Sequence, residues 1–266
     1  TTLNTKTKMS PKLLEYALGD GIHAFSTMRT AGASQGAYAQ FNINPYCGDA
    51  PEHVAQNLHS LCRVLGIAPS NLVMPHQTHE TTVRQVGREL LSMPQNVRQM
   101  VLDGVDALIT NVPGVCIGVS TADCIPILLY DAEHRATAAI HAGWRGTVKR
   151  IAQNAIAQMR AAFNTNPRTL RAVIAPGISL QHFEVGDEVY EAFAKAAFPM
   201  NDIAQRHNKW HINLPLCNQL QLQELGVKAE NIYATDICTY NRCNDFFSAR
   251  RLGINSGRIF TGVTIR

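Results

Sequence analysis

Three short segments bring together the residue types that bind transition metals. They are His76–Glu80, Ser120–Pro126 and Ala139–Thr147, and each lies beside an apolar stretch with small or turn-forming residues. The ends of strands are positions where a rigid scaffold presents side chains to a cleft. Imidazole nitrogens with one thiolate suit zinc or copper, and three protein ligands leave one tetrahedral position open for water or substrate. The segments therefore predict a catalytic metal site.

The spacing of these residues leaves ordinary structural roles open. Cys124 could pack in the core as a small apolar residue, and His141 could be a hydrogen-bonded histidine at a strand end. His76 and His79 are equivalent on spacing, and either could simply be exposed. A zinc-stabilised interaction module is a further alternative. It requires a fourth protein ligand that closes the site, and the sequence offers no clear fourth ligand.

The segment after His141 also has the features of an anion-binding site. Gly143 and Gly146 let the backbone approach a ligand closely, and the helix expected from Thr147 offers free amide groups at its start. Arg145 adds a guanidinium suited to phosphate or carboxylate, although a salt-bridged surface position would suit it equally.

The apolar pattern predicts an α/β fold in which these segments lie at strand ends. Helical spacing indicates helices over Ala50–Leu65, Thr147–Phe163, Gly186–Ala197 and Leu214–Leu225. The expected strands are Ile22–Met28, Leu72–Met74, Thr81–Val86, Ala107–Thr110, Val115–Ser120, Ile125–Tyr130, Thr137–His141, Arg171–Ala175, Ile232–Ala234 and Ile259–Val263. Because the order is mixed rather than regularly alternating, it favours mixed sheets in a single domain over residues 1–266, and not a Rossmann or TIM fold.

The composition excludes several classes of protein. Of 266 residues, 45% are hydrophobic and 17% are charged, which is typical of a globular chain. The net charge of +4 is not concentrated in a basic block, so we expect no nucleic-acid partner. The polar start of the chain is unlike a secretory signal, and no apolar run reaches the roughly 18 residues that span a membrane. Seven cysteines without a disulfide spacing predict reduced thiols and a cytoplasmic location.

At the three segments the sequence resembles the laccase-domain or YfiH-type family. This family is also named the multicopper polyphenol oxidase family and is described as containing zinc-dependent purine nucleoside phosphorylases. The strings Thr-Ala-Asp-Cys-Ile-Pro at 121–126 and His-Ala-Gly-Trp-Arg-Gly-Thr at 141–147 are highly specific for it. The resemblance also includes Phe25–Arg29, Phe41–Asn44, Ala175–Ile178, Phe183–Gly186, Phe246–Arg251 and Gly257–Arg258. It implies packed mixed sheets with outer helices, in an αββα-like arrangement.

The resemblance also implies which residues bind the metal. The family ligands fall on His79, Cys124 and His141, and the Gln-x-His motif selects His79, after Gln77, over His76. We expect zinc at this site. Copper is the alternative, since intrinsic affinities favour copper and the availability of each metal in the cell decides which ion is bound.

The implied activity is the phosphorolysis of adenosine, inosine, guanosine and methylthioadenosine, together with deamination of adenosine. Cys124 and His141 would then be catalytic, and Asp123 would move protons. Substrate and phosphate would contact a second set of residues, because guanidinium pairs well with phosphate. This set is Arg29, His76, Gln77, Arg145 and Arg250. We expect a purine nucleoside and phosphate to be the only partners. We also expect a monomeric protein that does not associate with a membrane.

Two other reactions remain open at the same residues. Without metal, Cys124 and His141 could act as nucleophile and base in an amide hydrolase, including one that edits peptidoglycan precursors. A copper polyphenol oxidase is less suited, because ten dispersed histidines do not predict several copper centres. The sequence departs from the family at His182, where a cysteine is frequent, and in the polar stretch between His79 and Asp103, which predicts an enlarged loop.

Overall fold

The computed structural model describes residues 10–266. Residues 1–9, which include most of the polar start, lie outside this description, so the extent of the domain to Thr1 stays a prediction. Within residues 10–266, no helix combines the length and apolar character that crossing a membrane requires.

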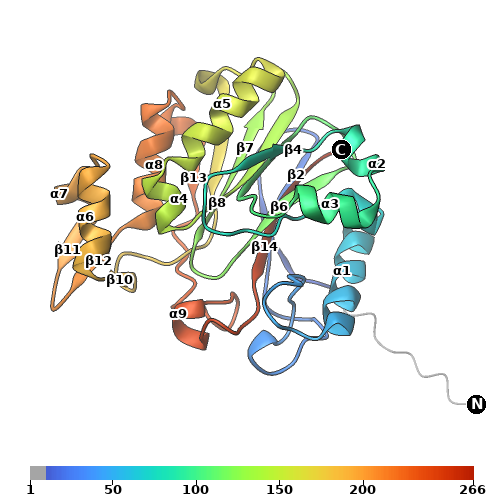
Figure 1. Ribbon diagram of the computed structural model, residues 1–266, viewed down its shortest axis with the longest axis horizontal. Helices are drawn as coiled ribbons and strands as arrows, with labels where there is room; N and C mark the ends of the chain where they lie inside the picture. Colours follow the sequence, from blue (N-terminus) through green and yellow to red (C-terminus); the bar gives the residue numbers. More distant parts are fainter. Residues whose placement is uncertain (1–9) are drawn as a thin grey trace, which may run out of the picture.

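Two mixed β-sheets packed face to face form the body of the molecule (Figure 1). The five-stranded sheet has the order β1 (Leu13–Tyr16), β2 (Ile22–Thr27), β14 (Ile259–Ile265), β6 (Cys116–Thr121) and β3 (Leu72–Val73). The six-stranded sheet has the order β13 (Ile232–Ala234), β9 (Arg171–Ile174), β7 (Ile125–Asp131), β8 (Ala136–Ala142), β5 (Ala107–Thr110) and β4 (Val83–Gln85). Three pairs are parallel, namely β3 with β6, β4 with β5 and β9 with β13, and the others are antiparallel.

Alternating side chains of each strand fill two separate apolar layers. In β7, Leu128 and Tyr130 contact the five-stranded sheet, whereas Ile127 and Leu129 point to the outer helices. Strands buried on both faces have nearly continuous apolar sequences, as β7 and β8 do. Both of these strands are completely buried, so they form a rigid base for the residues at their ends.

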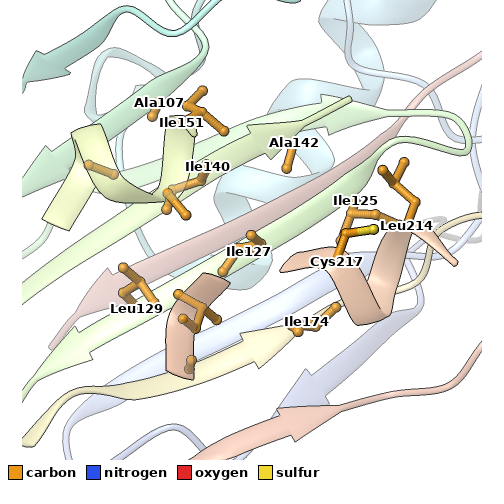
Figure 2. Close-up of a cluster of buried hydrophobic side chains, with 14 of the residues drawn as sticks. Ala107, Ile125, Ile127, Leu129, Ile140, Ala142, Ile151, Ile174, Leu214 and Cys217 are labelled. Atoms are coloured by element: carbon orange, nitrogen blue, oxygen red, sulfur yellow. The ribbon is translucent and has the colours of Figure 1, made fainter. Parts of the chain in front are cut away.

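Helices cover the outer faces of both sheets. Helices α5 (Ile151–Phe163) and α8 (Leu214–Glu224) lie on the six-stranded sheet, where Leu214 and Cys217 contact Ile125 and its neighbours (Figure 2). On the other side, α1 (Pro51–Leu65) covers the five-stranded sheet with Leu61 and Cys62. The expected α/β class with packed mixed sheets and outer helices is therefore confirmed.

A third, antiparallel sheet lies to one side of the molecule and was absent from the sequence prediction (Figure 1). Its strands are β10 (Glu184–Val185), β12 (Trp210–Ile212) and β11 (Ala204–Arg206), and they accompany α6 (Asp187–Lys195) and α7 (Met200–Ile203). The enlarged loop predicted after His79 is not a loop throughout. It contains β4, α2 (Arg88–Ser92) and α3 (Gln95–Val101), and Val86, Leu90 and Leu102 anchor it in the core.

The helix predicted over Thr147–Phe163 is in fact two helices, α4 (Trp144–Val148) and α5. The break lies at Arg150, whose φ of 64° is left-handed. The Arg150 guanidinium donates to Glu224 and to the Ala196 carbonyl, and these contacts hold the break in place. Apolar residues continue on both sides of the break, which is why spacing alone indicated one helix. As a result, α4 begins only three residues after His141.

Candidate metal centre

Two connections between the sheets bring His79 and Cys124 to the same edge of the molecule. The chain passes from the five-stranded to the six-stranded sheet between β3 and β4, where His79 lies, and again between β6 and β7, where Cys124 lies. His141 is near the end of β8 and pairs with Pro126 at the start of β7. The register of β7 and β8 therefore places Cys124 beside His141.

The three predicted ligands come together in the structure. Potential donor atoms of His79, Cys124 and His141 all lie within 4.8 Å of one another. The two imidazole rings meet edge to face with centroids 4.8 Å apart. His79 is exposed, Cys124 is half-buried and His141 is 2% exposed, so the cluster opens to solvent on the His79 side.

Asp106, which the sequence analysis missed, organises this cluster. Its buried carboxylate accepts a hydrogen bond from His141 Nδ1 at 2.7 Å. It also accepts bonds from the backbone amides of Thr78, His79 and Glu80, at 3.2, 3.0 and 2.9 Å. Asp106 thus orients His141 and fixes the loop that carries His79. Its only signal in the sequence is an acidic residue directly before a strand.

Two residues at the ligand turns have left-handed backbone conformations. His79 has a φ of 64° and Asp123 a φ of 85°, and such values are uncommon outside glycine. The Asp123 carboxylate accepts bonds from the Thr239 hydroxyl, at 2.7 Å, and from the backbone amide of Arg250, at 2.6 Å. These bonds stabilise the sharp turn that presents Cys124. Asp123 is not among the residues that line the pocket beside the ligands.

The donor set and its surroundings fit a zinc ion. Since His141 Nδ1 donates to Asp106, Nε2 is the nitrogen left to bind a metal, as in many carboxylate–histidine–metal sites. A methyl group built on Gly143 would lie 3.1 Å from Cys124 Sγ, 3.1 Å from His79 Cδ2 and 3.7 Å from His141 Nε2. The lack of a side chain at Gly143 therefore leaves space next to all three ligands, and any larger residue would fill that space.

Cys124 and His141 form a charge-coupled pair. Burial opposes a charge on His141, but Cys124 and Asp106 raise its pKa to about 9, so a metal would displace the proton on Nε2. Burial alone would raise the pKa of Cys124, but the charges and hydrogen bonds of His141 and His79 outweigh it and lower that pKa. For Asp106, burial opposes ionisation, yet the bond from His141 and the backbone amides keep its pKa below the ordinary value. The cluster therefore favours a thiolate, which is the form of cysteine that binds metals.

A cavity of about 170 Å³ opens beside the ligands. His76 and Gln77, two of the residues predicted to contact substrate, line it. Gln77 is also bound on both sides to the backbone of Ser120, donating to its carbonyl and accepting from its amide, both at 2.7 Å. Gln77 therefore ties the His79 loop to the end of β6. His76 Nδ1 donates to Asp103 at 2.6 Å.

None of the three arginines predicted to bind phosphate lines this cavity. Arg29 donates to the carbonyls of Ala39 and Cys243, and Arg145 lies over the Trp144 ring. Arg250 donates to the carbonyls of His182 and Glu184. The arginine that does line the cavity is Arg258, which comes from the loop after α9 (Ala249–Leu252). Sequence reasoning noted Arg258 only as part of the family resemblance.

Comparison with known proteins agrees with this architecture. The family model described as multi-copper polyphenol oxidoreductase laccase matches residues 23–266. A purine nucleoside phosphorylase from Bacteroides thetaiotaomicron is 48% identical over 247 residues, which cover 92% of each chain. Adenosine deaminase RL5, from an unknown prokaryotic organism, is 43% identical over 247 residues, covering 92% of this chain and 94% of the relative.

Solved structures show the same fold. The crystal structure of the hypothetical protein YfiH from Bacillus licheniformis matches with a TM-score of 0.89 and 25% identity, covering 97% of both chains. A second structure, YlmD from Geobacillus stearothermophilus, matches with a TM-score of 0.85 at 26% identity and covers 93% of both. The sequence resemblance is thus confirmed, and the chain belongs to the YfiH-type family of multi-copper polyphenol oxidoreductase laccases.

Proposed function

We propose that this protein is a zinc-dependent purine nucleoside phosphorylase that also deaminates adenosine. The observation that carries the proposal is the convergence of His79, Cys124 and His141 beside a cavity, with Asp106 orienting His141. Three ligands with an open side are typical of catalytic rather than structural zinc. The names of two relatives, a purine nucleoside phosphorylase and an adenosine deaminase, supply the substrate class.

His79, Cys124 and His141 would hold the ion. Bound zinc would supply a Lewis acid and lower the pKa of a coordinated water. Asp106 keeps a proton on His141 Nδ1 and so leaves Nε2 as the atom that would bind the ion. We assign Asp123 a positioning role instead of the expected proton transfer, because its carboxylate is already bonded to Thr239 and to the Arg250 amide.

Arg258 is the best placed cation for phosphate. It lines the cavity, whereas Arg29, Arg145 and Arg250 do not. Its guanidinium donates to the carbonyls of Ile254 and Ser256, which fixes its position in the loop. Its place in the lining of the cavity, and not a free guanidinium, therefore favours Arg258 over Arg29, Arg145 and Arg250.

The proposal is tested by measuring products and metal together. Purified protein of known zinc content is incubated with inosine or adenosine, with and without phosphate, and the products are separated by chromatography. Phosphorolysis predicts free base and ribose 1-phosphate only with phosphate, in proportion to bound zinc, and deamination predicts inosine from adenosine without phosphate. Cys124→Ala should abolish both reactions. Full activity in Cys124→Ala, or no product from zinc-loaded wild type, would contradict the proposal.

A second candidate follows from the same geometry. Without metal, Cys124, His141 and Asp106 would serve as the nucleophile, base and orienting carboxylate of a cysteine hydrolase. This reading predicts that zinc inhibits cleavage of an amide substrate and that chelation restores it. A zinc requirement for turnover would eliminate it.

The alternative of a copper polyphenol oxidase, disfavoured by the sequence, is supported less well than the two reactions above. A multicopper oxidase needs several metal centres, and residues 10–266 contain one cluster of at least three His, Cys, Asp or Glu ligands. We also propose a cytoplasmic location, because all seven cysteines are free thiols. The expected monomer stays a prediction.

A further inference from the structure

Tyr46 presents an aromatic ring at the cavity beside the three ligands and takes no part in holding them. It lines the cavity together with His76 and His79. Its ring stacks on the His76 imidazole with centroids 4.3 Å apart and planes inclined by 29°. Even so, 45% of Tyr46 is exposed, so part of its surface remains available to a ligand.

His76 is held rigidly behind the tyrosine. Its Nδ1 donates to Asp103 at 2.6 Å, and its backbone bonds to Leu102 and Gly104 at 3.0 Å each. Both the position and the plane of the imidazole are therefore set by the segment after α3. A ring stacked on His76 has a fixed orientation before any ligand binds, which lowers the entropic cost of binding.

The loop that carries Tyr46 is also anchored. The Tyr46 amide donates to Asn44 Oδ1 at 2.7 Å, and the Asn44 amide donates to Asn42 Oδ1 at 3.2 Å. Asn42 Oδ1 also accepts from the backbone amide of Arg258 at 3.1 Å. The Tyr46 loop and the loop that carries Ile254 and Arg258 are thus joined at the cavity.

Exposed apolar side chains are concentrated at this cavity. Six large apolar side chains are exposed among the described residues, and two of them, Tyr46 and Ile254, line this one small cavity. Ile254 is 71% exposed. A single exposed tyrosine is ordinary on a protein surface. An oriented aromatic ring and an exposed isoleucine beside metal ligands instead form a surface suited to a flat, apolar ring.

We propose that Tyr46, backed by His76, is the surface on which the purine base of the substrate stacks, with Ile254 as a second apolar contact. This inference rests on the proposed nucleoside activity and names the residue that binds the base. Stacking tolerates different bases because every base has a π-face. The surface therefore accepts adenine and hypoxanthine alike, and selection between them falls to other contacts. A purine also covers more of the ring than a pyrimidine.

The test compares Tyr46→Ala, Tyr46→Phe and, as a control for loss of an exposed tyrosine, Tyr233→Ala in β13. Stacking predicts that Tyr46→Ala raises KM for inosine and adenosine by about 10- to 100-fold. Inhibition by hypoxanthine should weaken similarly, whereas inhibition by ribose 1-phosphate and the zinc content should not change. Tyr46→Phe keeps the ring and should restore most of the affinity. Tyr233 is 59% exposed and lies outside the cavity, so Tyr233→Ala should behave as wild type.

Two results would overturn the inference while leaving the proposed function intact. One is a KM within about twofold of wild type in Tyr46→Ala, which is less than the weakest stacking contribution expected. The other is an equal loss of affinity for hypoxanthine and ribose 1-phosphate, which would indicate general distortion of the cavity. If wild type turns over no nucleoside, the proposed function fails, and equilibrium dialysis with hypoxanthine still tests Tyr46. Binding that Tyr46→Ala abolishes supports the stacking surface, and absent or unchanged binding overturns it.

Discussion

Asp106 determines which nitrogen of His141 is available to a metal. Its carboxylate can only accept, so it holds a proton on His141 Nδ1 and leaves Nε2 as the nitrogen that can bind a metal. In Asp106→Asn, the amide can instead donate to Nδ1, and the imidazole then carries its proton on Nε2. We expect the affinity for zinc to fall about 10- to 100-fold, the usual effect of losing such a partner. Competition with a chromophoric chelator measures the change.

Asp131 provides a matched control for this variant. It is also fully buried, and it accepts from His134 Nδ1 at 2.9 Å and from the Thr165 hydroxyl at 2.6 Å, away from the metal ligands. Asp131→Asn should reduce the free energy of unfolding but leave zinc affinity unchanged. Equal losses of zinc in both variants would show that Asp106 acts through general stability alone.

The thiol of Cys124 should react at lower pH than that of Cys47, which lines the same cavity. His141 and His79 lower the pKa of Cys124 against the effect of burial, whereas burial raises the pKa of Cys47 despite the charge of Arg258. A lower pKa gives more thiolate, the reactive form, at a given pH. Alkylation of metal-free protein by iodoacetamide over a pH series, followed by peptide mass mapping, should therefore modify Cys124 first as pH rises. Prior modification of Cys47 would contradict this protonation pattern.

At the level of elements, apolar periodicity predicted the strands that carry the site. Strands β5 to β9 all lie within a residue or two of the predicted ranges, because each buries an alternating or continuous apolar stretch. Short strands of the third sheet were missed, since two or three residues are too few to show a period. Asp106 and Tyr46 were missed for another reason. Their roles depend on partners far along the chain, and no local pattern contains that information.

The end of α6 shows how a missing glycine misled the sequence prediction, which extended this helix to Ala197. The chain instead leaves the helix there, with Ala197 at a left-handed φ of 59°. Phe198 donates to the Phe193 carbonyl and Ala197 to the Ala194 carbonyl, and the two phenylalanine rings meet at 5.1 Å. This is a Schellman motif, in which the left-handed position is usually glycine.

Ala197→Gly should therefore stabilise the protein. Relief of the left-handed strain should raise the free energy of unfolding by about 1 kcal/mol. As a control, Ala194→Gly lies within α6 and is exposed, and it should lower the free energy of unfolding by about 0.5–1 kcal/mol. Urea unfolding measures both changes. Destabilisation by Ala197→Gly would mean that the Cβ of Ala197 makes contacts that outweigh the strain.

For the whole molecule, a metal at this site would join both sheets. His79 and Cys124 lie on the two connections that pass between the sheets, and His141 lies at the end of a central strand. The residues are 45 and 17 positions apart, so an unfolded chain does not hold them together. A ligand that binds the folded state alone stabilises it by about 2.7 kcal/mol at 100 times its dissociation constant.

Thermal stability should therefore depend on zinc in the wild type and not in Cys124→Ala. We expect the wild-type Tm to rise with free zinc and to fall on addition of a chelator, because zinc binds the assembled ligands and not the dispersed ones. In Cys124→Ala two histidines remain, and the Tm should be nearly constant over the same series. Calorimetry at several buffered zinc concentrations measures this directly. A wild-type Tm that is insensitive to zinc would indicate that the three residues converge for a purpose other than binding this metal, and would favour the cysteine hydrolase reading.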